Sequence, residues 1–256
     1  MKKYLTLFSQ RLSEYSTYRM RLFITILQGF ITPLFLLLVL SQAIPTGGTS
    51  TFGLIPYFLL VGLIYPLTRS KVNEFIEEQA TSGEINNFLV KPISLYKYTL
   101  ADDLSWKILN LLTLAPFIFI ACLVLLRDNS LNYNLTVLSI SLITTAISFL
   151  VSFNFSYLIG LFSFWFDEFW AINNVKLVVV TFLGGVVLPY SFFPDWSNHV
   201  LKYSPFPYML TWPVRVLRGQ FEPLEIIIAL FWCVIFGLSI KVLQRIAISK
   251  YSHTAN

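Results

Sequence analysis

Six stretches of apolar residues constrain this chain more than any other feature of its sequence. They cover about residues 22–44, 52–68, 108–126, 135–166, 177–188 and 223–240. A helix needs roughly 20 apolar residues to cross about 30 Å of hydrocarbon, where each backbone polar group must be paired internally. Because 56% of the residues are hydrophobic and only 12% are charged, the chain cannot cover a water-facing exterior with polar groups. The sequence therefore predicts an all-α polytopic membrane protein with about six transmembrane helices, and residues 1–256 form a single transmembrane domain.

The positive charges are distributed unevenly between the two sides of these spans. If the N-terminus is inside, fourteen of the eighteen Lys and Arg residues fall on the inner side, and the other side holds only Arg127, Lys202, Arg215 and Arg218. Since basic residues mark cytoplasmic loops, we expect both termini in the cytoplasm and the chain in the cell (inner) membrane. The net charge of +5 is therefore interpreted as orientation charge beside lipid, and no nucleic acid is expected as a partner. Within residues 1–21, apolar side chains recur every three or four positions between basic ones, which predicts an interfacial helix.

Half of the twelve prolines fall between Pro189 and Pro223, and five of these lie in the segment 189–222 between the fifth and sixth spans. Proline at this density breaks long helices, and the aromatic residues between the prolines suit the membrane interface. We expect an extracellular re-entrant hairpin of two short helices. Its candidate outer-gate residues are Phe192, Phe193, Trp196, Phe206 and Tyr208. The alternative is an aromatic belt with no gating role.

Motifs for chemistry are missing from the sequence. It contains no HExxH, GxSxG or CxxC pattern, and no glycine is followed by lysine, which excludes a GxxxxGK[ST] phosphate loop. We therefore expect no catalytic, cofactor-binding or metal-binding residues in this chain, which is not predicted to be an enzyme. Ionisable residues fall outside the middle of every predicted span, with Lys176 at the inner end of the fifth. This weakens an ion-coupled mechanism, although backbone carbonyls can also bind sodium.

Uncharged polar residues follow one face of the fourth predicted span. Ser141, Thr145, Ser148 and Ser152 recur at helical spacing, and Gln28 and Thr32 form a shorter version in the first span. Small polar side chains let helices approach closely and bond across the contact. The pattern favours helix packing, and these six residues are also the candidates for a pathway or dimer face.

The loop between the second and third spans, residues 69–94, carries the most informative pattern. Val72, Phe75 and Ile76 share one helical face, whereas Glu74, Glu77 and Glu78 share much of the other. Gly83 is suited to end that helix, and a second turn with Ile85, Phe88 and Leu89 stops before Pro92. We expect a cytoplasmic surface helix that offers an acidic, partly apolar face to a partner protein. The alternative is an interfacial helix docked on lipid.

Three segments carry a resemblance to a known family. They are Gly83-Glu84-Ile85 with Phe88-Leu89, then Lys91-Pro92-Ile93-Ser94, and Pro205-Phe206-Pro207-Tyr208 followed by Pro213 and Gly219. In this order and with this topology, the chain resembles the permease subunits of type-2 ATP-binding cassette (ABC) exporters, in the branch whose ATPase is a separate chain. The resemblance covers nearly the whole length.

The resemblance implies a permease that works with two ATPase (nucleotide-binding) subunits, which would bind the ATP and Mg, and with a second permease copy or a related permease in membrane lipid. It implies ATPase coupling through Phe75, Glu77, Glu78, Gly83, Glu84, Phe88 and Pro92. It also implies export of an amphipathic or hydrophobic substrate such as a drug, lipid or peptide. An ion-coupled secondary transporter remains the main alternative, followed by a membrane-embedded enzyme or an assembly scaffold.

Overall fold

The computed structural model describes residues 2–17, 51–83, 94–127, 134–166 and 169–254, together with the single residues 20, 24, 31, 35, 38, 39, 85 and 88. Most of the expected first span, including Gln28 and Thr32, lies outside the described residues. The same holds for Glu84 and Pro92 of the expected coupling segment. All regular secondary structure in the described part of the chain is helical.

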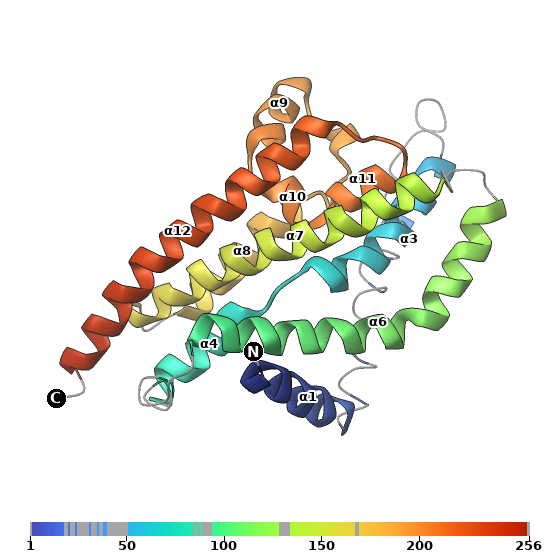
Figure 1. Ribbon diagram of the computed structural model, residues 1–256. Coiled ribbons are helices and arrows are strands. Elements are labelled where there is room, and N and C mark those ends of the chain that lie inside the picture. The colour runs from blue at the N-terminus through green and yellow to red at the C-terminus, as the bar shows by residue number, and fades with distance from the viewer. Residues whose placement is uncertain are drawn as a thin grey trace.

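Seven helices of ten or more residues are found in the part of the chain that the structure describes. They are α1 (Lys2–Thr17), α3 (Thr51–Thr68), α4 (Val72–Thr81), α6 (Leu95–Arg127), α7 (Leu135–Leu161), α8 (Phe169–Leu183) and α12 (Pro223–Thr254). Shorter elements follow α7 or α8: the 3-10 turns η1 (Phe162–Phe164) and η2 (Tyr190–Phe192), and the helices α9 (Asp195–Tyr203), α10 (Phe206–Leu210) and α11 (Trp212–Leu217). In Figure 1, α9 lies at the top, whereas α1, α4 and both termini lie in the lower part.

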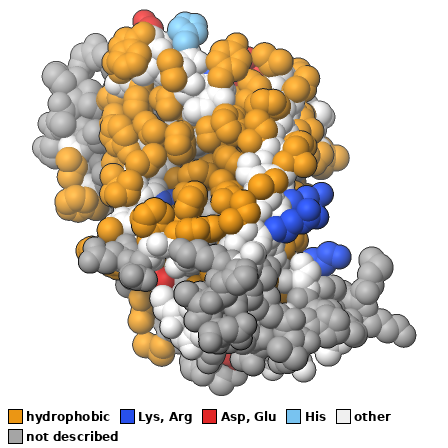
Figure 2. Space-filling model, turned by 90° about the vertical axis from the view of Figure 1, so that its left-hand side faces the viewer, with side chains coloured by type: hydrophobic (Ala, Val, Ile, Leu, Met, Phe, Trp, Pro, Cys, Tyr) orange, Lys and Arg blue, Asp and Glu red, His pale blue; other side chains and the backbone are white. Residues whose placement is uncertain are grey.

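Two segments of the described chain are long and apolar enough to cross a membrane. They are Leu135–Phe164, which is α7 with η1, and Pro223–Ala247 of α12, and α8 is a shorter apolar helix. On α12, Phe231, Val234 and Leu238 each expose more than half of their surface. Figure 2 shows hydrophobic side chains over most of the described surface on that side of the molecule. Only lipid solvates such a surface favourably, and the prediction of an all-α polytopic membrane protein is confirmed.

Element boundaries differ from the sequence prediction in three places. The fifth expected span, 177–188, is instead α8 at Phe169–Leu183, because Asn173, Asn174 and Lys176 lower the hydropathy of the first half of this helix. Helix α6 begins at Leu95, well before the third expected span. The expected hairpin of two short helices contains three, since the chain breaks at Ser204–Pro205 and again at Thr211. The expected helix after the second span is confirmed as α4, with Gly83 at φ 76° just beyond its end.

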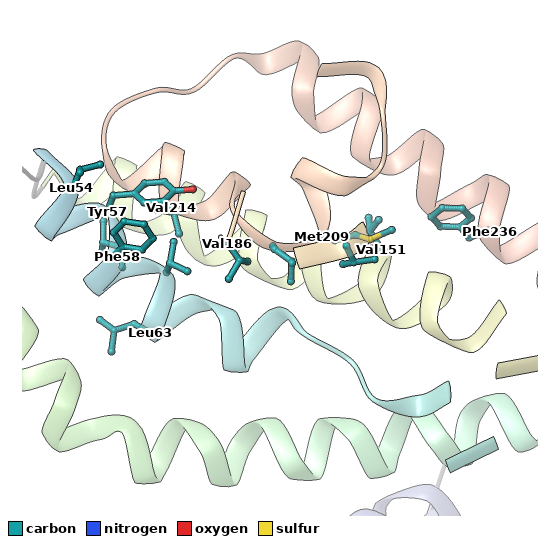
Figure 3. Packing of buried hydrophobic residues seen from close by; sticks show 13 residues of the cluster. Leu54, Tyr57, Phe58, Leu63, Val151, Val186, Met209, Val214 and Phe236 are labelled. Atoms are coloured by element: carbon teal, nitrogen blue, oxygen red, sulfur yellow. The ribbon is translucent and has the colours of Figure 1, made fainter. Parts of the chain in front are cut away.

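The hydrophobic clusters of the described chain pack along helix α7. Around its middle, Val151 lies in a cluster with Phe58 of α3, Met209 of α10 and Val214 of α11, as Figure 3 shows. Nearer its C-terminal end, Phe153, Tyr157 and Leu161 pack in a second cluster with Val72 and Ile76 of α4. One helix therefore touches both α4 and the α10–α11 segment.

Candidate functional site

Helix α4 rests directly on the C-terminal part of α7. Val72 and Ile76 are buried in this contact. A Cβ atom added to Gly160 of α7 would lie 2.9 Å from the Cα of Asn73 and 3.0 Å from the Cδ1 of Ile76. The two backbones approach so closely that only glycine fits at this position. A displacement of α4 must therefore move α7 or break this contact.

The turn between α3 and α4 is tied to α7 by hydroxyl groups. The backbone N–H of Ser70 donates to Oγ of Ser152 at 3.3 Å, and Oγ of Ser156 donates to the Ser70 carbonyl at 3.3 Å. Oγ of Ser70 in turn accepts from the N–H of Val72 at the start of α4. These bonds satisfy backbone groups in a buried turn that would otherwise lack partners.

Two charged side chains of helix α6 bond to the same turn. Nζ of Lys107 donates to the carbonyl oxygens of Pro66, at 3.1 Å, and of Arg69. Lys107 also pairs with Asp103, whose Oδ2 accepts from Oγ of Ser70 at 2.5 Å. Lys107 and Asp103 are both nearly buried, so each charge is compensated by the other and by hydrogen bonds.

The predicted polar stripe of α7 lies inside the chain. Ser141, Ser148 and Ser152 are buried and Thr145 is half-buried, where it donates to the Ser141 carbonyl at 2.7 Å. The hydroxyl of Ser148 is enclosed without a hydrogen-bond partner in the described part of the chain. Ser152 therefore serves helix packing, the first of the two roles that the pattern suggested, and a pathway or dimer role of the stripe remains a proposal.

The acidic face of α4 is largely exposed, although Glu74 also lines a cavity with residues of α7 and α8. Glu74 and Glu78 are exposed, and Glu77 is half-buried between them. Partial burial, helped by the negative charge of Glu74, raises the pKa of Glu77. Three carboxylates on an outward helical face form an anionic surface that suits a basic partner.

The aromatic residues predicted for coupling pack within the chain itself. The ring of Phe75 lies 6.3 Å from that of Phe88 and 5.8 Å from that of Tyr98, whose own centroid is 4.8 Å from Phe88. Arg11 of α1 lies over the Tyr98 ring and pairs with Asp102 at 3.2 Å. No local pattern points to Tyr98 or Arg11, because their contact joins residues 87 positions apart.

At the other end of the molecule, three hydroxyl groups cap the C-terminal end of α8. Tyr190 donates to the Leu183 carbonyl at 2.7 Å, Thr211 to the Gly184 carbonyl at 2.5 Å, and Tyr57 of α3 to the Gly185 carbonyl at 2.5 Å. Carbonyl groups at a helix end have no partner within the helix and need one from elsewhere. The φ of +79° at Gly185, a conformation that glycine adopts without strain, turns the chain out of the helix here.

Glu225, in the first turn of α12, fixes the α11 segment. Its side chain is almost fully buried and accepts from Nε1 of Trp212 at 2.8 Å and from a guanidinium nitrogen of Arg215 at 2.8 Å. A carboxylate at a helix N-terminus also interacts favourably with the helix dipole. Glu225 is not among the residues that the sequence analysis singled out.

The five predicted gate residues do not form one cluster. Tyr208 is fully buried against Trp212, and Phe206 lies against Phe155 of α7 with 6.3 Å between ring centroids. Phe192 packs at the edge of the core cluster around α3, and Phe193 contacts Phe182 at 5.4 Å. Trp196 is 72% exposed. Tyr57 and Thr211, which donate to the carbonyls of Gly185 and Gly184, were absent from the prediction.

Comparison with known families gives one assignment. Residues 26–255 fit the family described as ABC-2 family transporter protein. The chain belongs to the ABC-2 transporter family. It is therefore an ABC permease subunit embedded in a membrane, of a family that works with an ATPase, as the resemblance predicted. The match favours this function over an ion-coupled secondary transporter. A search of curated proteins finds no match.

Proposed function

We propose that this ABC-2 permease exports an amphipathic or hydrophobic substrate with energy from ATP, which two separate ATPase subunits bind with Mg and hydrolyse. A second copy of the chain, or a related permease, completes the membrane part. The α4 end faces the cytoplasm, where the ATPase subunits bind, and the α9–α11 segment faces outward. This orientation is supported by the excess of Lys and Arg residues on the α4 side of the predicted spans.

The observation that carries the proposal is the two-faced packing of α4. Its apolar face is fixed on α7 at Gly160, and its carboxylates at Glu74, Glu77 and Glu78 face outward. A partner that binds the acidic face can therefore displace α4 without first disrupting the packing of buried hydrophobic side chains. Because the α4–α7 contact is close-packed, that movement is passed to α7.

Helix α7 carries the movement to the opposite end. Its middle and N-terminal parts contact α10 and α11, where Trp212 and Tyr208 pack against α7 and α12 residues. When the ATPase subunits close on ATP, α4 and the end of α7 are displaced together, and the hydroxyl-capped joint at Gly184–Gly185 is the place where the outer segment opens. The permease then alternates between an outward-open conformation, which releases the substrate, and a resting conformation in which the outer segment is closed.

Reversing the acidic face provides the test. In Glu74→Lys/Glu78→Lys, affinity for the cognate ATPase subunit in mild detergent should fall at least about tenfold, because two attractive contacts become repulsive. Thermal stability of the isolated permease should stay close to wild type, since both side chains are exposed. ATP hydrolysis should appear only in the complex and be lost with the variant.

The matched control is Glu222→Lys, which makes the same charge reversal at an exposed residue of the α9–α12 side. It should leave ATPase binding unchanged. Equal binding by the α4 double variant and the wild type would contradict the proposal, as would transport by the purified permease without its ATPase.

A further inference from the structure

A groove lies between the C-terminal half of α12 and the start of α6, two segments in the lower left part of Figure 1. Its volume is about 460 Å³, within the range of roughly 300–1,000 Å³ that is typical of small-molecule sites. One wall includes Ser94 and Tyr96. The other is a stripe of α12 whose residues recur at helical spacing, namely Val234, Gly237, Leu238, Lys241 and Gln244. Because Val234 and Leu238 are more than half exposed, the groove opens to the surface that faces lipid.

The walls of this groove are held apart by packing on α7 and by a glycine. The hydroxyl of Tyr96 donates to Oδ1 of Asn154 at 2.7 Å, and its ring lies edge-on to Phe153 and Tyr157, with 5.3 Å between centroids in each pair. On α12, a Cβ atom added to Gly237 would meet nothing within 4 Å, so the absent side chain leaves open space. The groove is therefore preformed.

The groove changes from apolar to polar along α12, and the change falls at the depth of lipid head groups. Lys241 follows Pro223, the first residue of α12, by eighteen positions. At about 1.5 Å per residue this is about 27 Å, close to the roughly 30 Å of the hydrocarbon layer. With the start of α12 at one interface, Lys241 therefore lies near the other, and Leu238, Gly237 and Val234 lead from it into the hydrocarbon.

The polar end carries positive charge that the described chain does not neutralise. Lys241 is exposed, and Arg245, one turn further along the same face, is exposed too. Among the described residues, neither forms an ion pair, and no acidic residue lines the groove. The sequence has no Asp or Glu after Glu225. Basic side chains at this depth attract anionic lipid head groups.

From these observations we infer that the groove binds an anionic phospholipid of the surrounding membrane, with its phosphate beside Lys241 and Gln244 and part of one acyl chain along the apolar stripe of α12. The ammonium and the amide donate to phosphate oxygens, and the apolar side chains cover the first methylenes of the chain. This lipid is a resident of the leaflet on the α4 side. That this leaflet is the cytoplasmic one rests on the orientation in the proposed function, whereas the binding step does not.

Native mass spectrometry of the full-length permease in mild detergent, titrated with dioleoyl phosphatidylglycerol, tests the site. The wild type should bind this lipid at least about fivefold more tightly than dioleoyl phosphatidylcholine, which has the same chains and no net charge. Lys241→Gln should weaken phosphatidylglycerol binding about fivefold, the effect of one lysine near a membrane surface, and leave phosphatidylcholine binding unchanged. The matched control is Lys71→Gln, which removes an exposed lysine beside α4 that does not line the groove, and it should bind like wild type.

A second pair of variants tests the shape of the groove. Gly237→Leu fills the open space and should weaken binding of both lipids at least about fivefold, because two or more methylenes of the acyl chain lose their contact. Gly237→Ala leaves most of the groove open and should bind like wild type. Both variants should melt close to the wild-type temperature, since nothing lies within 4 Å of the new Cβ atom.

Equal affinities of Lys241→Gln and Lys71→Gln for phosphatidylglycerol would overturn the inference, and so would equal affinities of the wild type for the two lipids. If Gly237→Leu dissociates a dimer and leaves lipid binding unchanged, the groove receives a second copy of the chain and the inference is wrong. ATP-driven release of the bound phosphatidylglycerol would contradict a resident lipid and identify a transported one. Because the lipid titration uses the permease alone, failure of the ATPase to bind would overturn the proposed function and leave the lipid site to be decided by this comparison.

Discussion

The segments at the two ends of the molecule pack in opposite ways. Helix α4 buries one face on α7 and leaves three carboxylates outside, whereas α10 and α11 are almost completely enclosed, with Met209, Trp212 and Val214 at 0% exposure. Near α4 the buried turn is braced by charges, Lys107 and Asp103. At the other end, neutral hydroxyl groups from three elements cap α8.

This difference distinguishes an exposed acidic face, which the proposed function assigns to the ATPase partner, from a segment whose side chains are mostly buried within the chain. An exposed acidic face loses little when it is mutated in the isolated chain and much when its partner is present. In an enclosed segment, a substitution should lower the stability of the isolated chain and change partner binding little, because the side chains there bond to other parts of the same chain. Substitutions at the α10–α11 end should therefore be read first as changes in stability, and those on the acidic face as changes in assembly.

The largest expected effect is at the enclosed end. Glu225→Gln leaves Arg215 without its carboxylate and weakens the bond to Trp212. Breaking a buried ion pair costs 3–5 kcal/mol, and because Arg215 is partly exposed we expect about 3 kcal/mol of lost unfolding free energy. Denaturant unfolding in detergent micelles measures it. The matched control is Glu222→Gln, which breaks the exposed pair with Lys202 and should leave the unfolding midpoint unchanged. Equal midpoints for the two variants would contradict the enclosed packing of α11.

A smaller loss is expected where α4 meets α7. Gly160→Ala places a methyl group 2.9 Å from the Cα of Asn73, and overpacking against backbone costs about 1–3 kcal/mol. Since alanine also favours the helix by up to about 1 kcal/mol, we expect a net loss of about 1–2 kcal/mol. Gly237→Ala on α12 has nothing within 4 Å of the new methyl group and should be neutral or slightly stabilising. ATP-driven transport should fall with Gly160→Ala alone. A wild-type melting curve for that variant would show that α4 is loosely attached.

The cap on α8 should contribute less. Tyr57→Phe removes the hydroxyl that donates to the Gly185 carbonyl and leaves this buried acceptor unpaired, which costs about 1 kcal/mol. Thermal melting of the purified chain measures this loss. Tyr203→Phe removes a hydroxyl from an exposed ring and provides the control. If both variants melt at the wild-type temperature, the hydroxyl cap does not hold the segment closed.

The sequence predicted the elements of this fold better than their contacts. Apolar runs identified α3, α7 and α12, and the alternation of Val72 and Ile76 with three glutamates identified α4 and its buried face. These features are local, since they depend on helical periodicity and hydropathy alone. The capping of Gly185 by Tyr57 joins residues 128 positions apart, and nothing near either residue signals it.

The candidate site was predicted only in part for the same reason. The glutamates of α4 are exposed as expected, but Phe75 is used within the chain, against Phe88 and Tyr98. Hydropathy also misplaced the start of α8, because Asn173 and Lys176 look like loop residues until their partners on α4 are known. Polar residues in a membrane helix become interpretable only when the facing helix is in place.

The smallest expected effect concerns the titration of the acidic face. Because partial burial and the charge of Glu74 raise the pKa of Glu77, this carboxyl takes up its proton at a higher pH than an ordinary glutamate as the solution is acidified. The charged form attracts a basic partner, so ATPase affinity should fall by up to about threefold as acidification protonates Glu77, the size expected for one exposed ion pair. Titration of the complex by fluorescence anisotropy measures it.

Two variants sharpen this last prediction. Glu77→Gln cannot titrate and should remove that part of the pH dependence that is due to the permease. Glu74→Gln removes the repulsion, lowers the pKa of Glu77 and should shift the loss of affinity to lower pH. Because both substitutions lie on the exposed face, neither should change the melting temperature. Identical pH profiles for the wild type and Glu77→Gln would mean that the ATPase does not bind the acidic face of α4 through this residue, and the contrast between an open α4 and a closed α10–α11 segment would then lose its functional meaning.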